Sequence, residues 1–177
     1  MTSRSMCGSI KVRPATERDA EVVASILTEA ARWQEQAGTP VWLEGELTAA
    51  KIGAEVAAEL FFLAEFEGGA VGTMKFQLED PLFWPDLATS DAAYVHRLAV
   101  RRHFAGRGVS TALLGWAAKR TLQLGRHLLR LDCDANRPRL RAVYENFGFR
   151  YHSDRQVGRY LVARYQYELN ATEVSGA

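Results

Sequence analysis

One stretch, residues 93–114 (AYVHRLAVRRHFAGRGVSTALL), constrains what this chain can fold into more than any other. Its first part, Val95 to Val100, is a short apolar segment bounded by charge, which predicts a buried strand. Gly106 and Gly108 mark a turn, and the apolar spacing from Ser110 onwards predicts a helix. The stretch therefore indicates a strand, a glycine-containing turn and the start of a helix.

The start of such a helix is a candidate site for phosphate. Its first N–H groups have no acceptor within the helix, and they lie at the positive end of the helix dipole. Arg101, Arg102 and Arg107 add positive charge near the same turn. An ordinary left-handed turn is the alternative explanation for the two glycines. The complete dinucleotide-binding motif is absent because position 111 is Thr, and the triphosphate-binding loop is absent as well.

Length and charge exclude several classes of protein. A chain of 177 residues is long enough for one full hydrophobic core, and a net charge of +1 gives no general attraction to nucleic acid or to an anionic membrane. The two cysteines, Cys7 and Cys133, are too few for a disulfide scaffold or a metal cluster, so we expect no metal site. Neither a secretory signal nor a membrane-spanning apolar run is found, and we expect a cytoplasmic protein.

Hydrophobic periodicity predicts a single domain over residues 9–170, with flexible termini at 1–8 and 170–177. The expected strands and helices are a strand at 9–15, a helix from Thr16 to about 37, a helix at 48–60, strands at 60–66 and 70–78, the central strand, the helix that ends at Gly125, a strand at 127–134, a helix ending at Gly148, and strands at 149–152 and 159–169. This order predicts a mixed α/β sheet flanked by helices. The strand–helix–strand connection at its centre implies a local parallel pair.

With these elements in place, the chain resembles the GNAT family of N-acetyltransferases. In that family the central strand ends in a sequence like Leu98-Ala99-Val100, and a glycine-containing loop leads into the helix, as residues 105–110 do here. Asn136 and the run Tyr144-Glu145-Asn146-Phe147-Gly148-Phe149 are similar to later family motifs. The resemblance implies a mostly antiparallel sheet of about seven strands with a splayed central parallel pair.

The resemblance also implies that acetyl-CoA is the cofactor, bound by the end of the central strand, the loop, the helix start and some later residues. These residues are Leu98, Ala99, Val100, Arg101, Arg102, Ala105, Gly106, Arg107, Gly108, Val109, Ser110, Thr111, Asn136, Arg139 and Tyr144. Two positions depart from the family pattern. Ala105 stands where the family has Gln or Arg, and Ser110 stands where it has Gly or Ala. Because backbone N–H groups carry most of the binding, we expect Ser110 to be tolerated and Ala105 to weaken binding modestly, with Arg101, Arg102 or Arg107 as substitutes for the lost charge.

Acetyl transfer to an amine needs a proton acceptor for the amine and a proton donor for the departing thiolate. The resemblance assigns the donor role to Tyr144 and the stabilisation of the oxyanion to the backbone N–H of Leu98. His96, on the central strand, is the candidate base, since an imidazole accepts protons near neutral pH. A structural histidine, a chain of water molecules or another carboxylate, such as Asp132, remain alternatives for this role. The other carboxylates considered are Asp134, Glu44 and Glu46.

Aromatic residues in the segments that flank the acceptor side of this fold are candidates for a substrate wall. We expect Trp33, Trp42 and Trp84, together with Phe83, to serve this purpose, with core packing or a dimer contact as the alternative for each. An acidic set could attract a cationic amine, or could form a solvated face. Its members are Glu44, Glu46, Glu79 and Asp80.

The sequence thus predicts an enzyme that transfers an acetyl group from acetyl-CoA to a primary amine of a small molecule by direct attack on the thioester. The alternatives are a non-catalytic acetyl-CoA sensor and a protein-modifying acetyltransferase. No nucleic-acid or membrane partner is expected. A homodimer is a further alternative to a monomer, because the tyrosine-bearing last strand offers an edge.

Overall fold

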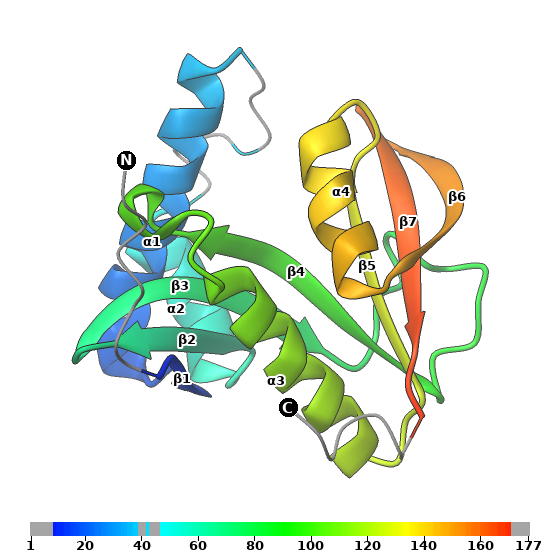
Figure 1. Ribbon diagram of the computed structural model, residues 1–177, viewed down its shortest axis with the longest axis horizontal. Helices are drawn as coiled ribbons and strands as arrows, with labels where there is room; N and C mark the ends of the chain where they lie inside the picture. The colour runs from blue at the N-terminus through cyan, green and yellow to red at the C-terminus, as the bar shows by residue number, and fades with distance from the viewer. Residues whose placement is uncertain (1–8, 39–41, 43–46, 171–177) are drawn as a thin grey trace. The chain divides into compact units, whose positions relative to one another are not determined.

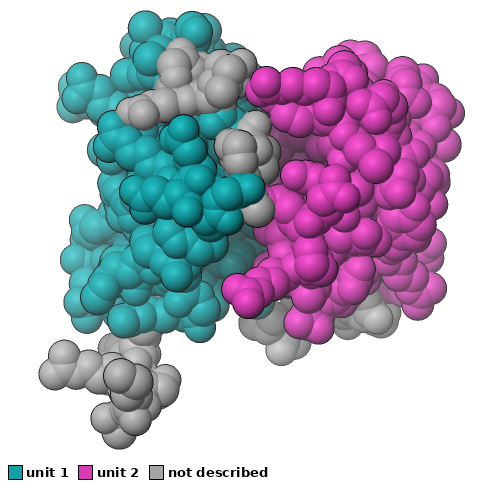
Figure 2. All heavy atoms as spheres, turned by 90° about the horizontal axis from the view of Figure 1, so that it is seen from above, with its two compact units in different colours: residues 1–75, 97–114 teal, residues 76–96, 115–177 magenta. Residues whose placement is uncertain are grey.

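A computed structural model describes residues 9–38, 42 and 47–170 of the chain. Its described part forms two compact units, each built from two segments of the chain (Figure 2). Unit 1 takes residues up to Lys75 together with Arg97–Leu114, and unit 2 takes Phe76–His96 together with the residues from Gly115 onwards. The predicted termini at 1–8 and 171–177 lie outside the described residues, and the single domain over 9–170 stays a prediction.

The strands form one seven-stranded sheet in the order β1-β2-β3-β4-β5-β7-β6 (Figure 1). Their bounds are β1 Lys11–Pro14, β2 Phe61–Phe66, β3 Gly69–Gln77, β4 Ala92–Val100, β5 Leu128–Asp134, β6 Arg150–Val157 and β7 Tyr160–Glu168. β4 pairs with β5 in parallel, whereas β1–β2, β2–β3, β5–β7 and β6–β7 are antiparallel. The predicted mixed, mostly antiparallel sheet with a central parallel pair is therefore confirmed.

The helices follow the predicted order. They are the 3-10 turns η1 Glu17–Asp19 and η3 Arg102–Phe104 and the α-helices α1 Ala20–Gln36, α2 Ala49–Ala57, α3 Val109–Gln123 and α4 Pro138–Phe147. Thr16 begins the first helical segment as predicted, because its N–H donates to Asp19 Oδ2 at 2.8 Å. Among the described helices, none combines the length and the apolar character needed to cross a membrane.

In unit 1, α1 and α2 bury their apolar faces together with residues of β2 in one hydrophobic cluster. Val23, Ile26 and Leu27 of α1 and Ile52 of α2 are fully buried, as the helical spacing of the sequence requires. Arg13 of β1 fixes the edge of this unit, since its guanidinium donates to Asp19 at 2.8 Å and to Glu65 at 2.8 Å. Local pattern and packing agree in this part of the fold.

Gly72 of β3 allows the first turn of α3 to lie close to the strand. A Cβ atom built on Gly72 would lie 2.7 Å from Val109 Cγ1 and 3.1 Å from the carbonyl oxygen of Ala99. Both distances are shorter than ordinary contacts, so only glycine permits this close approach. The position of the first turn of α3 therefore depends on having no side chain at Gly72.

In unit 2, β5 pairs with β7 over its whole length, and α4 lies alongside these strands (Figure 1). Aromatic side chains fill the space between them, with Tyr144 of α4 6.3 Å from Tyr165 and Phe147 5.6 Å from Tyr167. The expected strand at 149–152 is longer than predicted. β6 runs to Val157 because its pairing with β7 continues to the hairpin at Gly158.

Candidate functional site

The parallel pairing of β4 with β5 determines which side chains become neighbours in unit 2. It covers four pairs of residues, from Ala92 with Leu128 to Val95 with Leu131. The next residues along the two strands are His96 and Asp132. Because side chains alternate along a strand, His96 and Asp132 continue the face on which Tyr94 lies beside Arg130. The guanidinium of Arg130 donates to the Tyr94 hydroxyl at 3.1 Å on that face.

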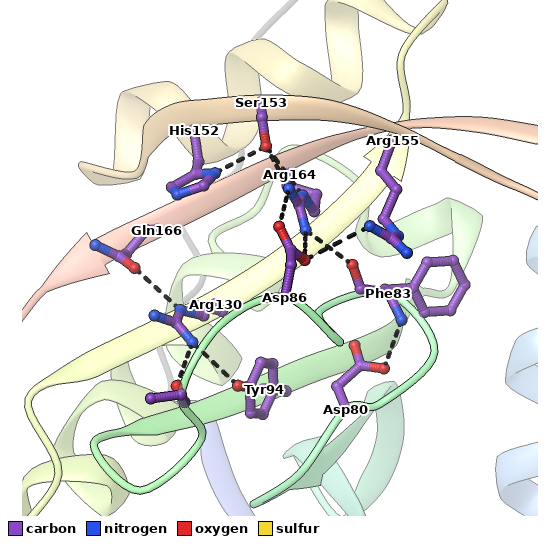
Figure 3. Close-up of polar contacts among 11 residues, drawn as sticks. Asp80, Phe83, Asp86, Tyr94, Arg130, His152, Ser153, Arg155, Arg164 and Gln166 are labelled. Carbon is purple, nitrogen blue, oxygen red and sulfur yellow. Dashed lines mark hydrogen bonds and ion pairs between the residues drawn. The ribbon is translucent and has the colours of Figure 1, made fainter.

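His96 lies between two carboxylates. Its Nε2 is 2.9 Å from Asp80 Oδ2, and its Nδ1 is 3.5 Å from Asp132 Oδ1. Asp80 belongs to the loop that joins β3 to β4, and its other oxygen accepts the N–H of Phe83 at 3.0 Å (Figure 3). The Phe83 ring lies 5.7 Å from the imidazole. An aromatic ring and two acidic groups thus surround the histidine that the sequence indicated as a base.

Burial sets the electrostatics of this cluster. The Asp80 side chain is 3% exposed and the Asp132 side chain 9%. Burial raises the pKa of Asp132 to about 6, and the negative charge of Asp80 acts in the same direction, whereas His96 and Arg164 oppose it. Burial also raises the pKa of the neighbouring Cys133 thiol to about 12, so Cys133 is not a thiolate nucleophile at neutral pH.

Trp84 fixes the loop that carries Asp80. The indole is fully buried, with the guanidinium groups of Arg130 at 5.1 Å and Arg164 at 4.8 Å from its ring centre. Arg164 is also held by Asp86 of the same loop, at 2.6 Å (Figure 3). The prediction that Trp84 forms part of a substrate wall is wrong, because a side chain with no exposed surface cannot contact a substrate. Phe83, only partly buried, lies beside His96 instead.

Tyr144, the predicted proton donor, is buried on α4 and packs edge-to-face on Phe149 at 6.1 Å. Burial raises the pKa of its hydroxyl, and the charges of Cys133 and Asp132 act in the same direction. The phenol therefore keeps its proton at neutral pH. Asn136 and Arg139, which the sequence assigned to cofactor binding, lie exposed before and at the start of α4.

Unit 1 holds the predicted phosphate-binding loop between η3 and α3. Gly106 has φ 73° and Gly108 has φ 83°, a left-handed conformation that favours glycine. A Cβ atom on either glycine would meet no atom within 4 Å, so the backbone conformation and not lack of space requires them. Ala105, Gly106, Arg107 and Gly108 are exposed, and the carbonyl of Gly108 accepts the N–H of Ala112 at 2.9 Å. The first N–H groups of α3, from Val109 to Thr111, follow directly.

The three arginines near this loop differ in their contacts. Arg101 donates to Glu29 at 2.7 Å and to the carbonyl of Ala70 at 3.0 Å, so it fixes the strand end to α1. A contact between Arg101 and a phosphate stays a prediction. The Arg102 guanidinium lies 4.2 Å from the Trp33 ring centre. Arg107 is exposed beside the Phe104 ring, 5.7 Å away, and lies within the loop itself.

The end of β4 is not a regular strand. Arg97 has a left-handed backbone with φ 49°, which interrupts the alternation of side chains between His96 and Leu98. Beyond it, Ala99 is buried in the core of unit 1, whereas Leu98 and Val100 are half-buried. Extended geometry alone therefore does not determine the direction of the Leu98 N–H group.

The remaining two tryptophans belong to unit 1. Trp33 is 42% exposed and, with Arg102, lines a hollow of about 770 Å³ along α1. Trp42 packs against the hydrophobic core of unit 1, which matches the core-packing alternative. A substrate contact stays a prediction for both. Glu44 and Glu46 lie outside the described residues.

Comparison with known proteins shows to which family this chain belongs. The sequence profile of the acetyltransferase (GNAT) family matches residues 27–149, more than half of the chain. The chain belongs to the GNAT acetyltransferase family. Among GNAT relatives, the uncharacterized N-acetyltransferase YesJ of Bacillus subtilis is 29% identical over 144 residues, which cover 78% of this chain and 80% of YesJ.

Solved GNAT structures share the fold. A GNAT acetyltransferase from Listeria monocytogenes has a TM-score of 0.77 and 25% identity, and the match covers 96% of this chain and 99% of that one. YncA from Salmonella typhimurium, a putative acetyltransferase solved with its cofactor acetyl-CoA, has a TM-score of 0.69 and 16% identity, with 92% and 95% covered. The family and the fold expected from the sequence are both confirmed, as is the assignment to the acetyltransferases.

Sequence reasoning about this GNAT protein missed the role of three residues. Asp80 was considered only as a member of an acidic surface set, yet it is buried against His96. The sequence assigned no role to Arg130 and Arg164, yet both are buried against the ring of Trp84. The loop has no periodic pattern. An Asp, an aromatic pair and a second Asp within residues 80–86 were the available signal.

Proposed function

We propose that this GNAT protein transfers the acetyl group of acetyl-CoA to a primary amine of a small molecule, by direct attack of the amine on the thioester. The observation that carries the proposal is the position of His96 between Asp80 and Asp132 at the end of the parallel strand pair. Two buried carboxylates favour a cationic ammonium group. They also stabilise the imidazolium that forms when His96 accepts its proton.

We assign the binding of acetyl-CoA, the acetyl donor, to the loop before α3. The pyrophosphate of acetyl-CoA binds the first N–H groups of that helix, where Gly106 and Gly108 leave the backbone exposed. Arg107 supplies positive charge within the same loop. Ala105 lacks the side chain of the family's Gln or Arg, so binding depends more on the backbone than in relatives that have it.

Acetyl transfer from acetyl-CoA to the amine needs no reactant besides these two molecules and water. His96 takes a proton from the ammonium group, directly or through water, and the neutral amine attacks the carbonyl carbon of the thioester. The backbone N–H of Leu98 donates to the oxyanion that forms. The carbon–sulfur bond then breaks, the attacking nitrogen releases its second proton to solvent, and the thiolate takes a proton from Tyr144, which its burial keeps protonated. The His96 imidazolium then loses its proton to solvent, and the Tyr144 phenolate regains one from solvent.

Calorimetric titration of acetyl-CoA into the wild type and into Gly108→Glu tests the donor site. A glutamate in the loop puts a carboxylate where the pyrophosphate is expected, so binding should fall below detection. Gly158→Glu is the matched control, because Gly158 also has a positive φ of 54° and open space around it, and it lies in the β6–β7 hairpin. Desulfo-CoA and ATP measure the contribution of the thioester and of the nucleotide.

A screen of small amines, read by the release of free CoA thiol, then tests turnover. Thiol release that depends on the amine and is lost in His96→Gln supports the proposal. Acetyl-CoA binding without thiol release from any amine would favour the sensor alternative. No binding to correctly folded wild type would refute both.

A further inference from the structure

The cluster of Asp80, His96 and Asp132 has a property that acetyl transfer does not require. Within the described part of the chain, Asp80 Oδ2, His96 Nε2 and Asp132 Oδ1 are buried and make no hydrogen bond. Two of these side chains are more than nine-tenths buried. Buried polar atoms are normally satisfied, and three unsatisfied atoms in one cluster therefore indicate a missing partner.

The short contact in this cluster is not directed like a hydrogen bond. Asp80 Oδ2 lies 2.9 Å from His96 Nε2, close enough for a hydrogen bond, yet the two atoms do not form one. The angle between the groups is therefore unfavourable. Two ligand atoms of the same metal ion also lie close together without forming a hydrogen bond. For a tetrahedral ion with bonds of 2.0–2.1 Å, the two ligand atoms are roughly 3.3 Å apart.

One ligand atom from each of the three residues lies within 4.8 Å of the others. An imidazole uses a single nitrogen to bind a metal, so the more distant carboxylate must move inward by about 1–1.5 Å to share an ion. Asp80 Oδ2 already lies close to His96 Nε2, and the Phe83 N–H holds the second oxygen of Asp80. A hydrogen bond of this kind orients a metal ligand.

The negative charge of the cluster also favours the binding of a cation. Two carboxylates are buried here with one imidazole. Arg164 acts on Asp132 but is bound to Asp86, at 2.6 Å and 3.1 Å. A dication would balance both carboxylates. One imidazole nitrogen with two carboxylate oxygens is a ligand set that suits Zn²⁺ and similar ions better than Mg²⁺.

We propose that Asp80, His96 and Asp132 form a binding site for a divalent transition-metal ion of the Zn²⁺ type, and that an ion bound there prevents His96 from accepting the proton of the amine. The metal would bind a ring nitrogen of His96 and block the lone pair that accepts the proton of the amine. Acetyl transfer would therefore stop, while acetyl-CoA would still bind at the loop before α3. The inhibitory part of this proposal rests on the proposed function. The binding part does not.

The binding part is tested on chelator-treated, full-length protein without a histidine tag. Titration with Co²⁺ should give the visible absorption bands of a four- or five-coordinate ion with one equivalent per chain, and Zn²⁺ should displace them. X-ray absorption of the Zn²⁺-loaded wild type should report one imidazole with oxygen ligands. This measurement needs no variant, so it remains informative if the variants fail to fold.

Variants identify the ligands. Asp80→Asn and Asp132→Asn should each weaken Zn²⁺ binding at least about tenfold, since even loss of an outer-shell partner costs 10–100-fold. His96→Gln should abolish binding. The matched control is His127→Asn, because His127 also lies 3.0 Å from an aspartate, Asp91, but in an exposed pair. Absence of the Co²⁺ bands, or equal loss in His127→Asn, would overturn the proposal.

The two proposals can fail separately. Metal binding is measured without acetyl-CoA or amine, so it stands or falls whether or not the protein acetylates anything. If turnover is found, Zn²⁺ should inhibit it reversibly, with activity restored by a chelator and with unchanged calorimetric binding of acetyl-CoA. Turnover that is insensitive to Zn²⁺ at concentrations that saturate the site would refute the inhibitory part alone.

Discussion

Replacing Gly72 with alanine tests whether close packing of β3 against α3 positions the loop at residues 105–108, the predicted phosphate site. The new Cβ would lie 2.7 Å from Val109 Cγ1, where ordinary contact begins at 3.4 Å, a shortfall of 0.7 Å. The carbonyl of Ala99, at 3.1 Å, belongs to the backbone and cannot rotate away. The first turn of α3 must therefore move, or Val109 must leave its preferred rotamer.

Overpacking of this kind costs about 1–3 kcal/mol of unfolding free energy. For a domain of this size that corresponds to a fall in Tm of about 2–12 °C. Chemical denaturation monitored by circular dichroism measures the free energy, and calorimetry measures the affinity for acetyl-CoA. We expect the affinity to fall as well, because Val109 is the first residue of the helix that begins at the loop.

Gly53→Ala is the control, because Gly53 lies within α2 and a Cβ atom added to it would meet no atom within 4 Å. It should stabilise the protein by about 0.5–1 kcal/mol, since alanine is the better helix former. Adding Val109→Ala to Gly72→Ala should recover about 1 kcal/mol relative to the sum of the single changes. If Gly72→Ala behaves like Gly53→Ala, or if Val109→Ala gives no recovery, the packing explanation is refuted.

Three further predictions concern unit 2. Tyr144→Phe should lower kcat about 10²–10⁴-fold with little change in acetyl-CoA affinity, measured by thiol release and calorimetry, because only the proton donor is removed; an unchanged kcat would exclude the donor role. The pKa of Asp132, about 6, lies above the value of about 3.9 in an unfolded chain, so the folded state binds the extra proton and this group makes stability fall as pH rises from about 4 to 6. Asp132→Asn should remove that part of the pH dependence in denaturation curves, and an unaltered slope would contradict it. Trp84→Ala should cost about 3–5 kcal/mol, and Trp84→Phe less, with a loss of activity in both because the loop that holds Asp80 loosens; normal activity in a destabilised Trp84→Phe would refute the link to Asp80.

Local sequence patterns predicted the parts of the fold that local forces determine. The apolar spacing of α1 and the turn at Gly106 and Gly108 were predicted correctly, because an amphipathic helix requires periodic apolar residues and a positive φ favours glycine. His96 and Asp132 were predicted only as competing candidates for the base, on two neighbouring strands joined by a parallel connection. Their registry, however, is set by strand pairing and is not visible in either segment alone.

The loop before β4 could not be predicted in the same way. Trp84 looked like an exposed loop aromatic, and Asp80 like a surface acid. Trp84 packs against Arg130 and Arg164, which lie 46 and 80 residues further along the chain. A cation stacked on an aromatic ring has no spacing signature. The ion pair of Arg101 with Glu29 has no such signature either, because the two residues are 72 positions apart.

The two interleaved units have a consequence for folding during synthesis. Unit 1 needs Arg97–Leu114 to be complete, so its first 75 residues must wait while the first segment of unit 2 leaves the ribosome. That segment carries Trp84 and Tyr94, whose buried surroundings come from β5 and β7. Neither unit can therefore be completed before part of the other has been synthesised. Nascent chains shorter than about 114 residues should be sensitive to protease and bound by chaperones.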